Sequence, residues 1–259
     1  MSGYLTELFK LNGKVAAITG GGGFLCSEMA YALAKCGISV AILDMREEKA
    51  VAVSNAVRSF GGNAFPMAMD VTKREDHRKA FERIISEFGD IDILINGAGI
   101  NASTPFFDIP LEEWHAILNS HITGTFMACQ VFGRYMVEKK KGSIINISSA
   151  SSGPPLSRAF TYSVAKAGIK NLTQNLAREW APYNVRVNAL RPGFFPTEWS
   201  MKNFITPERE KAILGHTPMG RYGNPAELIG AVLWLSSDAA SFVTGAEIAV
   251  DGGFSCMTI

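Results

Sequence analysis

Short apolar runs alternate with helical segments along this 259-residue chain, and this alternation constrains its fold most strongly. The runs are apolar at successive positions, which is typical of strands buried on both faces. They span residues 15–19, 38–43, 63–69, 91–95, 143–147, 185–190 and 247–250. The segments between them include a long helix that ends near Glu138 and another over 160–180. The pattern predicts the α/β class, with a doubly wound, seven-stranded parallel sheet and helices on both faces.

The domain organisation follows from the continuity of this pattern. At about 150 residues per domain, the length allows one domain or two. Because no linker, charge block or shift in composition divides the chain, we predict a single domain over 1–259. Residues 193–223 depart from this alternation, because a helix is expected directly after the strand that precedes them. Long loops inside compact domains are usually lids or binding loops, so we predict a substrate loop in this stretch.

The composition excludes several classes of partner. Lys and Arg total 25 and Asp and Glu total 24, so no basic field is available to gather nucleic acid or an anionic membrane surface. The uncharged run 114–133 carries too many polar side chains to span lipid, and the N-terminus lacks the apolar core of a signal peptide. Four widely spaced cysteines fit a reducing compartment, and the histidines and cysteines show no metal-ligand spacing. We therefore expect a cytoplasmic protein without a metal.

A glycine-rich turn lies between the first strand and the first helix. The segment Thr19-Gly20-Gly21-Gly22-Gly23-Phe24-Leu25 offers backbone N–H groups and a helix N-terminus to a pyrophosphate. Asp44 ends the second strand, 24 residues after Gly20, where a carboxylate accepts both ribose hydroxyls and repels a 2′-phosphate. The glycine-rich turn and Asp44 together predict NAD as the cofactor, with NADP less favoured. The alternative is a plain turn followed by an aspartate that caps the next helix.

Tyr162 and Lys166 stand four residues apart on a predicted helix, so both side chains leave it on one face. A phenol is a poor proton donor or acceptor at neutral pH, and a nearby ammonium favours its ionised form. Ser149 follows the fifth strand, at the edge where open parallel sheets bind ligands. The three residues predict acid–base chemistry on a substrate oxygen, although each taken singly is a common surface residue.

These motifs resemble the short-chain dehydrogenases/reductases, and the resemblance covers essentially the whole chain. It rests on TGGGGFL, Asp44, Asp70-Val71, Asn96-Gly97-Ala98-Gly99, Ser149, Tyr162-Ser-Val-Ala-Lys166, Pro192-Gly193 with Thr197, and Val250-Asp251-Gly252-Gly253. The resemblance implies a Rossmann fold in which Tyr162 is the general acid/base, Lys166 binds the nicotinamide ribose and lowers the tyrosine pKa, and Ser149 orients the substrate oxygen. The implied cofactor contacts are Gly20, Gly23, Phe24, Leu25, Asp44, Asp70, Val71, Asn96, Ala98, Gly99, Tyr162, Lys166, Pro192, Gly193, Phe195 and Thr197.

Three motifs depart from the family pattern. The glycine loop usually reads TG-x-x-x-G-x-G, and Phe24 and Cys26 stand where its last two glycines would be. The family's NNAG is NGAG here, with Gly97 in place of the second Asn. His121 replaces an Asn that holds a proton-relaying water, and an imidazole of pKa ~6.5 suits such a relay. A structural, neutral histidine is the equal alternative for His121, which we count as the fourth catalytic residue.

Segments of the chain look most like the branch of the family that acts on sugar acids. That branch includes gluconate 5-dehydrogenases, 2-keto-3-deoxygluconate dehydrogenases and mannonate oxidoreductases. Arg158 is positioned to bind a carboxylate, although a solvent-facing Arg at a helix start is the commoner case. The predicted substrate residues are Ser149, Ser151, Arg158, Tyr162 and Trp199.

The resemblance and the pattern together predict an oxidoreductase that transfers a hydride between NAD(H) and a small hydroxyl or carbonyl substrate such as a sugar acid or polyol. An NADP-linked 3-oxoacyl-type ketoreductase and a non-catalytic dinucleotide sensor are the alternatives. We also predict a homotetramer, because the run 114–133 and the C-terminal residues 254–259 are more apolar than one core needs.

Overall fold

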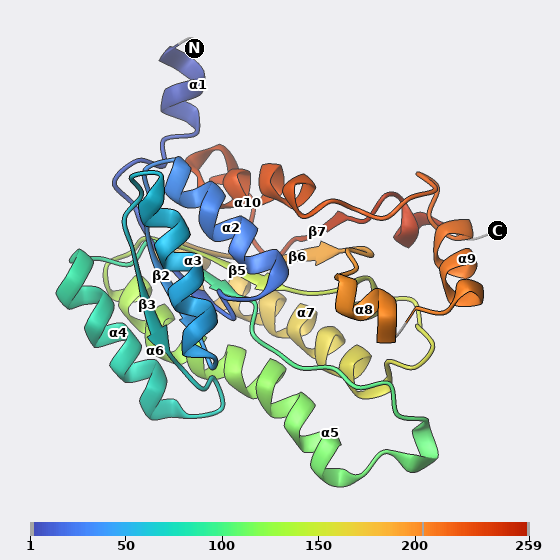
Figure 1. Cartoon of the computed structure of the whole chain (residues 1–259). Coiled ribbons are helices and arrows are strands. Elements are labelled where there is room, and N and C mark those ends of the chain that lie inside the picture. The colour runs from blue at the N-terminus through green and yellow to red at the C-terminus, as the bar shows by residue number, and fades with distance from the viewer. Residues whose placement is uncertain (1–2, 204, 258–259) are drawn as a thin grey trace.

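The computed structural model describes residues 3–203 and 205–257, apart from the side chains of Trp199 and Asn203. All seven predicted strands are present and form one parallel sheet in the order β3-β2-β1-β4-β5-β6-β7 (Figure 1). The strands are β1 (Val15–Thr19), β2 (Ser39–Asp44), β3 (Ala64–Ala68), β4 (Ile93–Asn96), β5 (Gly142–Ile147), β6 (Val185–Pro192) and β7 (Glu247–Val250). The order reverses between β1 and β4, which is where doubly wound folds bind their ligands.

Helices cover both faces of the sheet (Figure 1). The helices of the chain are α1 (Gly3–Leu8), which projects away from the sheet (Figure 1), α2 (Phe24–Lys35), α3 (Glu47–Ser59), α4 (Arg74–Phe88), α5 (Leu111–Leu118), α6 (Gly124–Glu138), α7 (Phe160–Trp180), α8 (Glu198–Asn203), α9 (Pro207–Gly215) and α10 (Ile229–Ser236). Ala16 and Ile18 of β1 pack into a core with α2, α3 and α10, whereas Val15 and Ala17 pack into a second core with α4, α6 and α7. Because each strand supplies both cores, its residues are apolar at successive positions, and the predicted doubly wound fold is confirmed. No helix of the described ranges is long and apolar enough to cross a membrane.

The predicted long helix before β5 is interrupted by a π-helical turn. Residues Asn119–Thr123 form this turn between α5 and α6, and the N–H of Gly124 donates to the carbonyl of Asn119. A π turn inserts an extra residue and often marks a functional position. It leaves His121 buried, with 3% of its surface exposed.

The predicted substrate loop contains two helices. After β6 the chain forms α8 and then α9, and both lie at the side of the molecule where β6 and β7 end (Figure 1). The Thr206 hydroxyl accepts a hydrogen bond from the N–H of Arg209, and Pro207 occupies the first position of α9. The stretch is therefore an ordered cover with its own caps.

Candidate active site

The glycine-rich turn brings the ends of β1 and β4 together. Gly20 has a φ of +66°, and a Cβ there would come within 2.8 Å of the Ala98 Cα. Gly23 occupies the N-cap of α2, and no side chain in the described part of the chain caps this helix. Its first N–H groups therefore remain available to an anion, which fits a dinucleotide pyrophosphate.

Cys26 and Gly97 are two departures from the family pattern that fit each other. Cys26 is buried on α2, and a Cβ on Gly97 would overlap its Sγ atom. Burial raises the pKa of the Cys26 thiol to about 12, so it is a packed, unreactive side chain. The Sγ atom of Cys26 therefore occupies the space that a side chain at position 97 would need.

Asp44 points back towards the glycine-rich turn. Its carboxylate accepts hydrogen bonds from the N–H of Gly22 at 3.1 Å and from the N–H of Arg46 at 3.0 Å. The Nε atom of Arg46 lies 3.8 Å from the same carboxylate. A carboxylate has about four acceptor positions, so two remain for the hydroxyls of a ribose.

The remaining predicted cofactor residues surround the same edge of the sheet. The Asn96 side chain donates to the Asn146 Oδ1 at 2.8 Å, and its own buried Oδ1 has no partner within the described residues. The Asp70 carboxylate accepts from the N–H and the hydroxyl of Thr72, whereas Val71 packs where a Cβ on Gly124 would be. The others follow the ends of β1, β4 and β6: Phe24 and Leu25 on α2, Gly99, Pro192, Gly193, Phe195 and Thr197.

Ser149, Tyr162 and Lys166 meet beyond the end of β5. The Nζ atom of Lys166 lies 5.4 Å from the centroid of the Tyr162 ring and donates to the carbonyl of Ile147 at 2.6 Å. Ser149 and Tyr162 line one cavity of about 420 Å³, below the substrate loop. The predicted juxtaposition of strand end and helix face is therefore present.

The pKa values of the pair differ from the expectation. Burial raises the pKa of Tyr162 above its ordinary value of 10, and the Ser149 hydroxyl only partly opposes that rise. Burial also lowers the pKa of Lys166 to about 8. The expected lowering of the tyrosine pKa is thus not seen, because burial raises it.

His121 contacts the Tyr162 ring edge-on, with centroids 5.2 Å apart. Its Nε2 donates to the carbonyl of Ile100 at 2.8 Å, which leaves Nδ1 as an acceptor without a partner among the described residues. Burial, assisted by the charge of Lys166, lowers the pKa of His121 to about 3. This pKa lies well below the value of about 6.5 expected for a relay group, which favours the alternative of a neutral histidine, and the role of His121 in catalysis stays a prediction.

The predicted substrate residues fall into three groups. Arg158 lines the cavity together with Ser149 and Tyr162. Ser151 does not line it: 3% of Ser151 is exposed, and its hydroxyl donates to Ser149 at 3.1 Å, so its contact is with the catalytic serine. Trp199 belongs to α8, but its side chain lies outside what the structure describes.

Three further polar residues line the cavity and are absent from the sequence prediction. Asn101 follows β4, Ser200 belongs to α8, and Arg209 belongs to the first turn of α9. Thr206 followed by Pro207 is an N-cap and N1 signature, and it would have predicted α9 and the position of Arg209 in its first turn.

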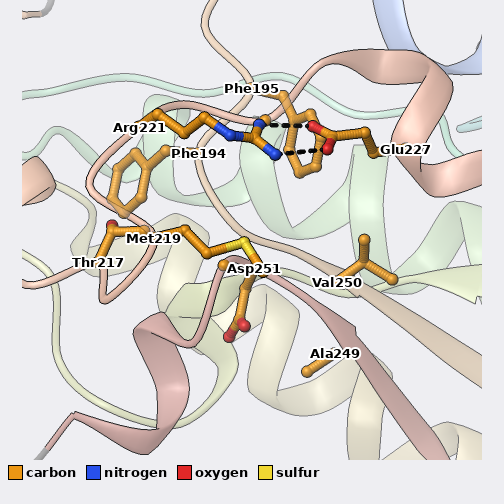
Figure 2. A pocket seen from close by; sticks show the side chains of 11 residues that line it. Phe194, Phe195, Thr217, Met219, Arg221, Glu227, Ala249, Val250 and Asp251 are labelled. Atoms are coloured by element: carbon orange, nitrogen blue, oxygen red, sulfur yellow. Dashed lines mark hydrogen bonds and ion pairs between the residues drawn. The ribbon is translucent and has the colours of Figure 1, made fainter.

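A second cavity of about 350 Å³ lies on the other side of Phe194 and Phe195, which line both cavities. Figure 2 shows Arg221 in this second cavity, where its guanidinium forms two hydrogen bonds with the Glu227 carboxylate. The charge of Arg221 is therefore neutralised. No group of three potential metal ligands occurs in the ranges that the structure covers.

Known proteins with similar sequences and structures cover almost the whole chain. A family model described as enoyl-(acyl carrier protein) reductase matches residues 25–255. The 5-keto-D-gluconate 5-reductase of Escherichia coli (strain K12) is 37% identical over 253 residues, 96% of this chain and 98% of that protein.

Two solved structures share the fold along its full length. A gluconate 5-dehydrogenase from Burkholderia cenocepacia J2315, in complex with NADP and tartrate, is 33% identical with a TM-score of 0.93 and covers 98% of this chain and 100% of its own. A candidate D-mannonate oxidoreductase from Haemophilus influenza with bound NAD is 35% identical with a TM-score of 0.91 and covers 96% and 97%. Matches of this extent, on a fold whose sheet edge gathers Ser149, Tyr162 and Lys166, place the chain in the short-chain dehydrogenase/reductase family.

Proposed function

We propose that this protein is an NAD(H)-dependent oxidoreductase that interconverts a secondary alcohol and a ketone on a sugar acid. The observation that carries the proposal is the single cavity onto which Ser149, Tyr162 and Arg158 open, with Lys166 buried behind the tyrosine. A bound nicotinamide ring would accept or donate the hydride. Gly20, Gly23 and the start of α2 would hold the pyrophosphate of the cofactor, with Asp44 on a ribose.

The chain's own residues supply the proton chemistry. The Ser149 hydroxyl donates to the substrate oxygen and orients it, and Ser151 holds Ser149 in place. Tyr162 takes the hydroxyl proton during oxidation and returns it during reduction. Because burial raises the pKa of Tyr162, the phenolate needs the Lys166 ammonium beside it. The hydrogen bond that this ammonium donates to the Ile147 carbonyl holds it in place.

The substrate class is inferred from the cavity and from the relatives. Relatives named for sugar acids include those of 5-keto-D-gluconate, gluconate and mannonate, whereas others are named for D-threitol, xylitol or a 3-oxoacyl-[acyl-carrier-protein]. Asn101, Ser200 and Thr197 line the cavity beside Arg158 and offer hydrogen bonds to a hydroxylated chain with a carboxylate. Leu156, Ile205 and Ile213 line the same cavity and are the feature that favours the acyl chain of a 3-oxoacyl thioester.

Turnover across a panel tests this proposal. Wild-type protein is assayed with aldonates and ketoaldonates, alditols, and a 3-oxoacyl thioester, each with NAD(H) and NADP(H). We expect the highest kcat/KM with a sugar acid. Highest kcat/KM with the thioester would favour the ketoreductase alternative, and cofactor binding without turnover of any substrate would favour the dinucleotide sensor.

We also propose NAD as the preferred cofactor. Asp44 would bind the ribose diol and repel a 2′-phosphate, as its place at the end of β2 suggests. Arg46, 3.8 Å from that carboxylate, is the feature that favours NADP, and two of the solved neighbours contain NADP.

Asp44→Ala should narrow or reverse the preference for NAD, because the repelling charge is removed while Arg46 stays. The ratio of kcat/KM values for NAD and NADP measures the effect, with exposed Glu48→Ala on α3 as the control. A wild-type enzyme that already prefers NADP would refute the role of Asp44.

We also propose a homotetramer, but the surface that supports it differs from the one expected from the sequence. Phe254 is buried against Phe194 and His216, so the C-terminal segment offers less apolar surface than expected, and residues 258–259 lie outside the described ranges. Exposed apolar side chains occur instead on α5, α6 and α7, at Leu111, Phe126, Phe160 and Val164. Such a surface suits contact with further copies of the chain. The cytoplasmic location stays a prediction.

A further inference from the structure

Two arginines from different elements line the catalytic cavity. Arg158 belongs to the turn before α7, and Arg209 belongs to the first turn of α9 in the substrate loop. The guanidinium of Arg209 donates to the carbonyl of Ser157 at 3.2 Å, which holds it beside the backbone of Arg158. Burial lowers the pKa of Arg209, and the positive charge of Arg158 lowers it further, as expected of two cations that lie close together.

Neither arginine has a carboxylate partner within 4.0 Å among the residues that the structure describes, whereas Arg191 pairs with Glu247 and Arg221 pairs with Glu227. The described residues that line the catalytic cavity include no Asp, Glu or Lys. Arg158, which is exposed, and Arg209, which is half-buried, therefore line the cavity without a counter-charge from its described walls. Like charges held together in this way favour a site that receives an anion.

The local backbone supports the same conclusion. Arg158 has a φ of +57°, a left-handed conformation that is strained for any residue with a Cβ. Ala159 follows as the N-cap of α7 and also lines the cavity, and within the described residues no side chain caps this 21-residue helix. The positive end of the α7 dipole thus opens on the same space as the two arginines.

We propose that Arg158 and Arg209 form a two-sided clamp for the carboxylate of the sugar acid, and that this clamp selects acids over the corresponding alditols. The clamp rests on the proposed function, since it assumes that the substrate carries a carboxylate. It joins the turn before α7 to α9, so the carboxylate is bound between the fixed catalytic helix and the cover above it. The opposite end of the substrate is then left to Ser149 and Tyr162.

Binding measurements test the clamp without requiring turnover. Calorimetric titration of the protein with NADH present gives the affinity for a set of five- and six-carbon aldonates and ketoaldonates, and for the alditol of the tightest-binding acid. Loss of a charge-assisted hydrogen bond reduces affinity by about 10- to 100-fold. We therefore expect Arg158→Gln and Arg209→Gln each to weaken acid binding by that factor and to leave alditol binding and NADH affinity within about two-fold.

Lys211→Gln is the matched control, because it removes one positive charge from the exposed surface of the same helix, α9. It should keep the wild-type ratio of acid to alditol affinity. Arg209→Lys should recover part of the acid affinity, since it restores the charge without the planar fork.

The clamp is overturned if wild-type protein binds none of the acids, or if both Arg→Gln variants keep the wild-type ratio of affinities. It is upheld if the ratio collapses in these variants and persists in Lys211→Gln. Failure of the proposed function has a different signature: acids bind through the arginines, yet wild-type enzyme oxidises or reduces none of them.

Discussion

At the scale of single residues, the chemistry depends on a lysine kept out of water. Lys166 is 3% exposed, and burial lowers its pKa to about 8, so it remains mostly cationic at neutral pH while losing little by giving up a proton at mildly alkaline pH. This positive charge stabilises the phenolate of Tyr162, which lies four residues earlier on α7. Both side chains leave the same face of this helix, which keeps the ammonium beside the ring.

Tyr162→Phe should reduce kcat by about 10²–10⁴-fold, because the ring stays and only the hydroxyl that transfers the proton is removed. The dissociation constant for NADH should stay within a few-fold. Steady-state kinetics and a fluorescence titration measure the two effects, with exposed Tyr183→Phe as the control. Near-wild-type turnover in Tyr162→Phe would exclude the residue from the mechanism.

His121 should make the protein less stable in acid. Its pKa is about 3 in the folded chain against 6.5 as its ordinary value, so between these values the unfolded chain binds a proton that the folded chain does not. The native state keeps its full stability above pH 6.5 and loses up to about 1.4 kcal/mol per pH unit as the pH falls towards 3.

His121→Asn should therefore show a smaller fall in unfolding free energy between pH 7 and pH 5 than wild type. Urea titrations at the two pH values measure it, and exposed His115→Asn on α5 should behave as wild type. An unchanged pH dependence in His121→Asn would show that the imidazole is protonated in the folded protein after all.

Sequence patterns located most of the reacting groups because these depend on local rules. An i,i+4 spacing places Tyr162 and Lys166 on one face, and the end of a parallel strand places Ser149 at the ligand edge. The neutrality of His121 could not be predicted in this way, since it depends on a π turn and on burial by segments distant in sequence. Arg209 was missed because the cover that carries it was expected to be a loop.

At the scale of elements, α2 and β4 are fitted to each other through Cys26 and Gly97. The bounds of the strands and of α7 were predicted to within a few residues, because periodicity and turn residues are local features of the sequence; α7 runs from Phe160 to Trp180 as expected. The packing between two elements cannot be predicted from the sequence of either element alone. It appears only when the Sγ atom of Cys26 is found where a residue-97 side chain would be.

Gly97→Asn should destabilise the protein by about 1–3 kcal/mol, because the new side chain overlaps the Cys26 sulfur. Cys26→Gly should also destabilise it, by about 1 kcal/mol or more, since it places a glycine in α2 and leaves a gap. The double variant should be more stable than the sum of the two changes predicts. Urea unfolding of all four proteins gives the coupling energy.

Cys36→Gly provides the comparison, because Cys36 is the C-cap at the opposite end of α2. Its effect should add to that of Gly97→Asn, as expected for distant sites. Additivity in the Cys26 pair as well would contradict the fit between these two positions.

At the scale of the whole molecule, the exposed apolar side chains of α5, α6 and α7 predict an assembly of several copies. Phe126 and Val164 are 42% and 48% exposed, so Phe126→Asp and Val164→Asp leave the cores intact but place charge in the proposed interface. Light scattering should give about four times 28.0 kDa for wild type and a value near 28.0 kDa or twice that for the variants. Phe242→Asp, at another exposed position, should remain tetrameric, and a 28.0 kDa wild type at micromolar concentration would refute the assembly.

The strand order has a consequence for how this enzyme can diversify. Asp44 ends β2, on one side of the β1–β4 boundary, whereas Tyr162, Arg158 and Arg209 belong to segments that flank β6 on the other side. Sites that share no contacts change independently, so their effects on free energy add. The choice of dinucleotide and the choice of substrate are therefore two separate adjustments, and a chain with this topology can exchange one specificity while it inherits the other unchanged.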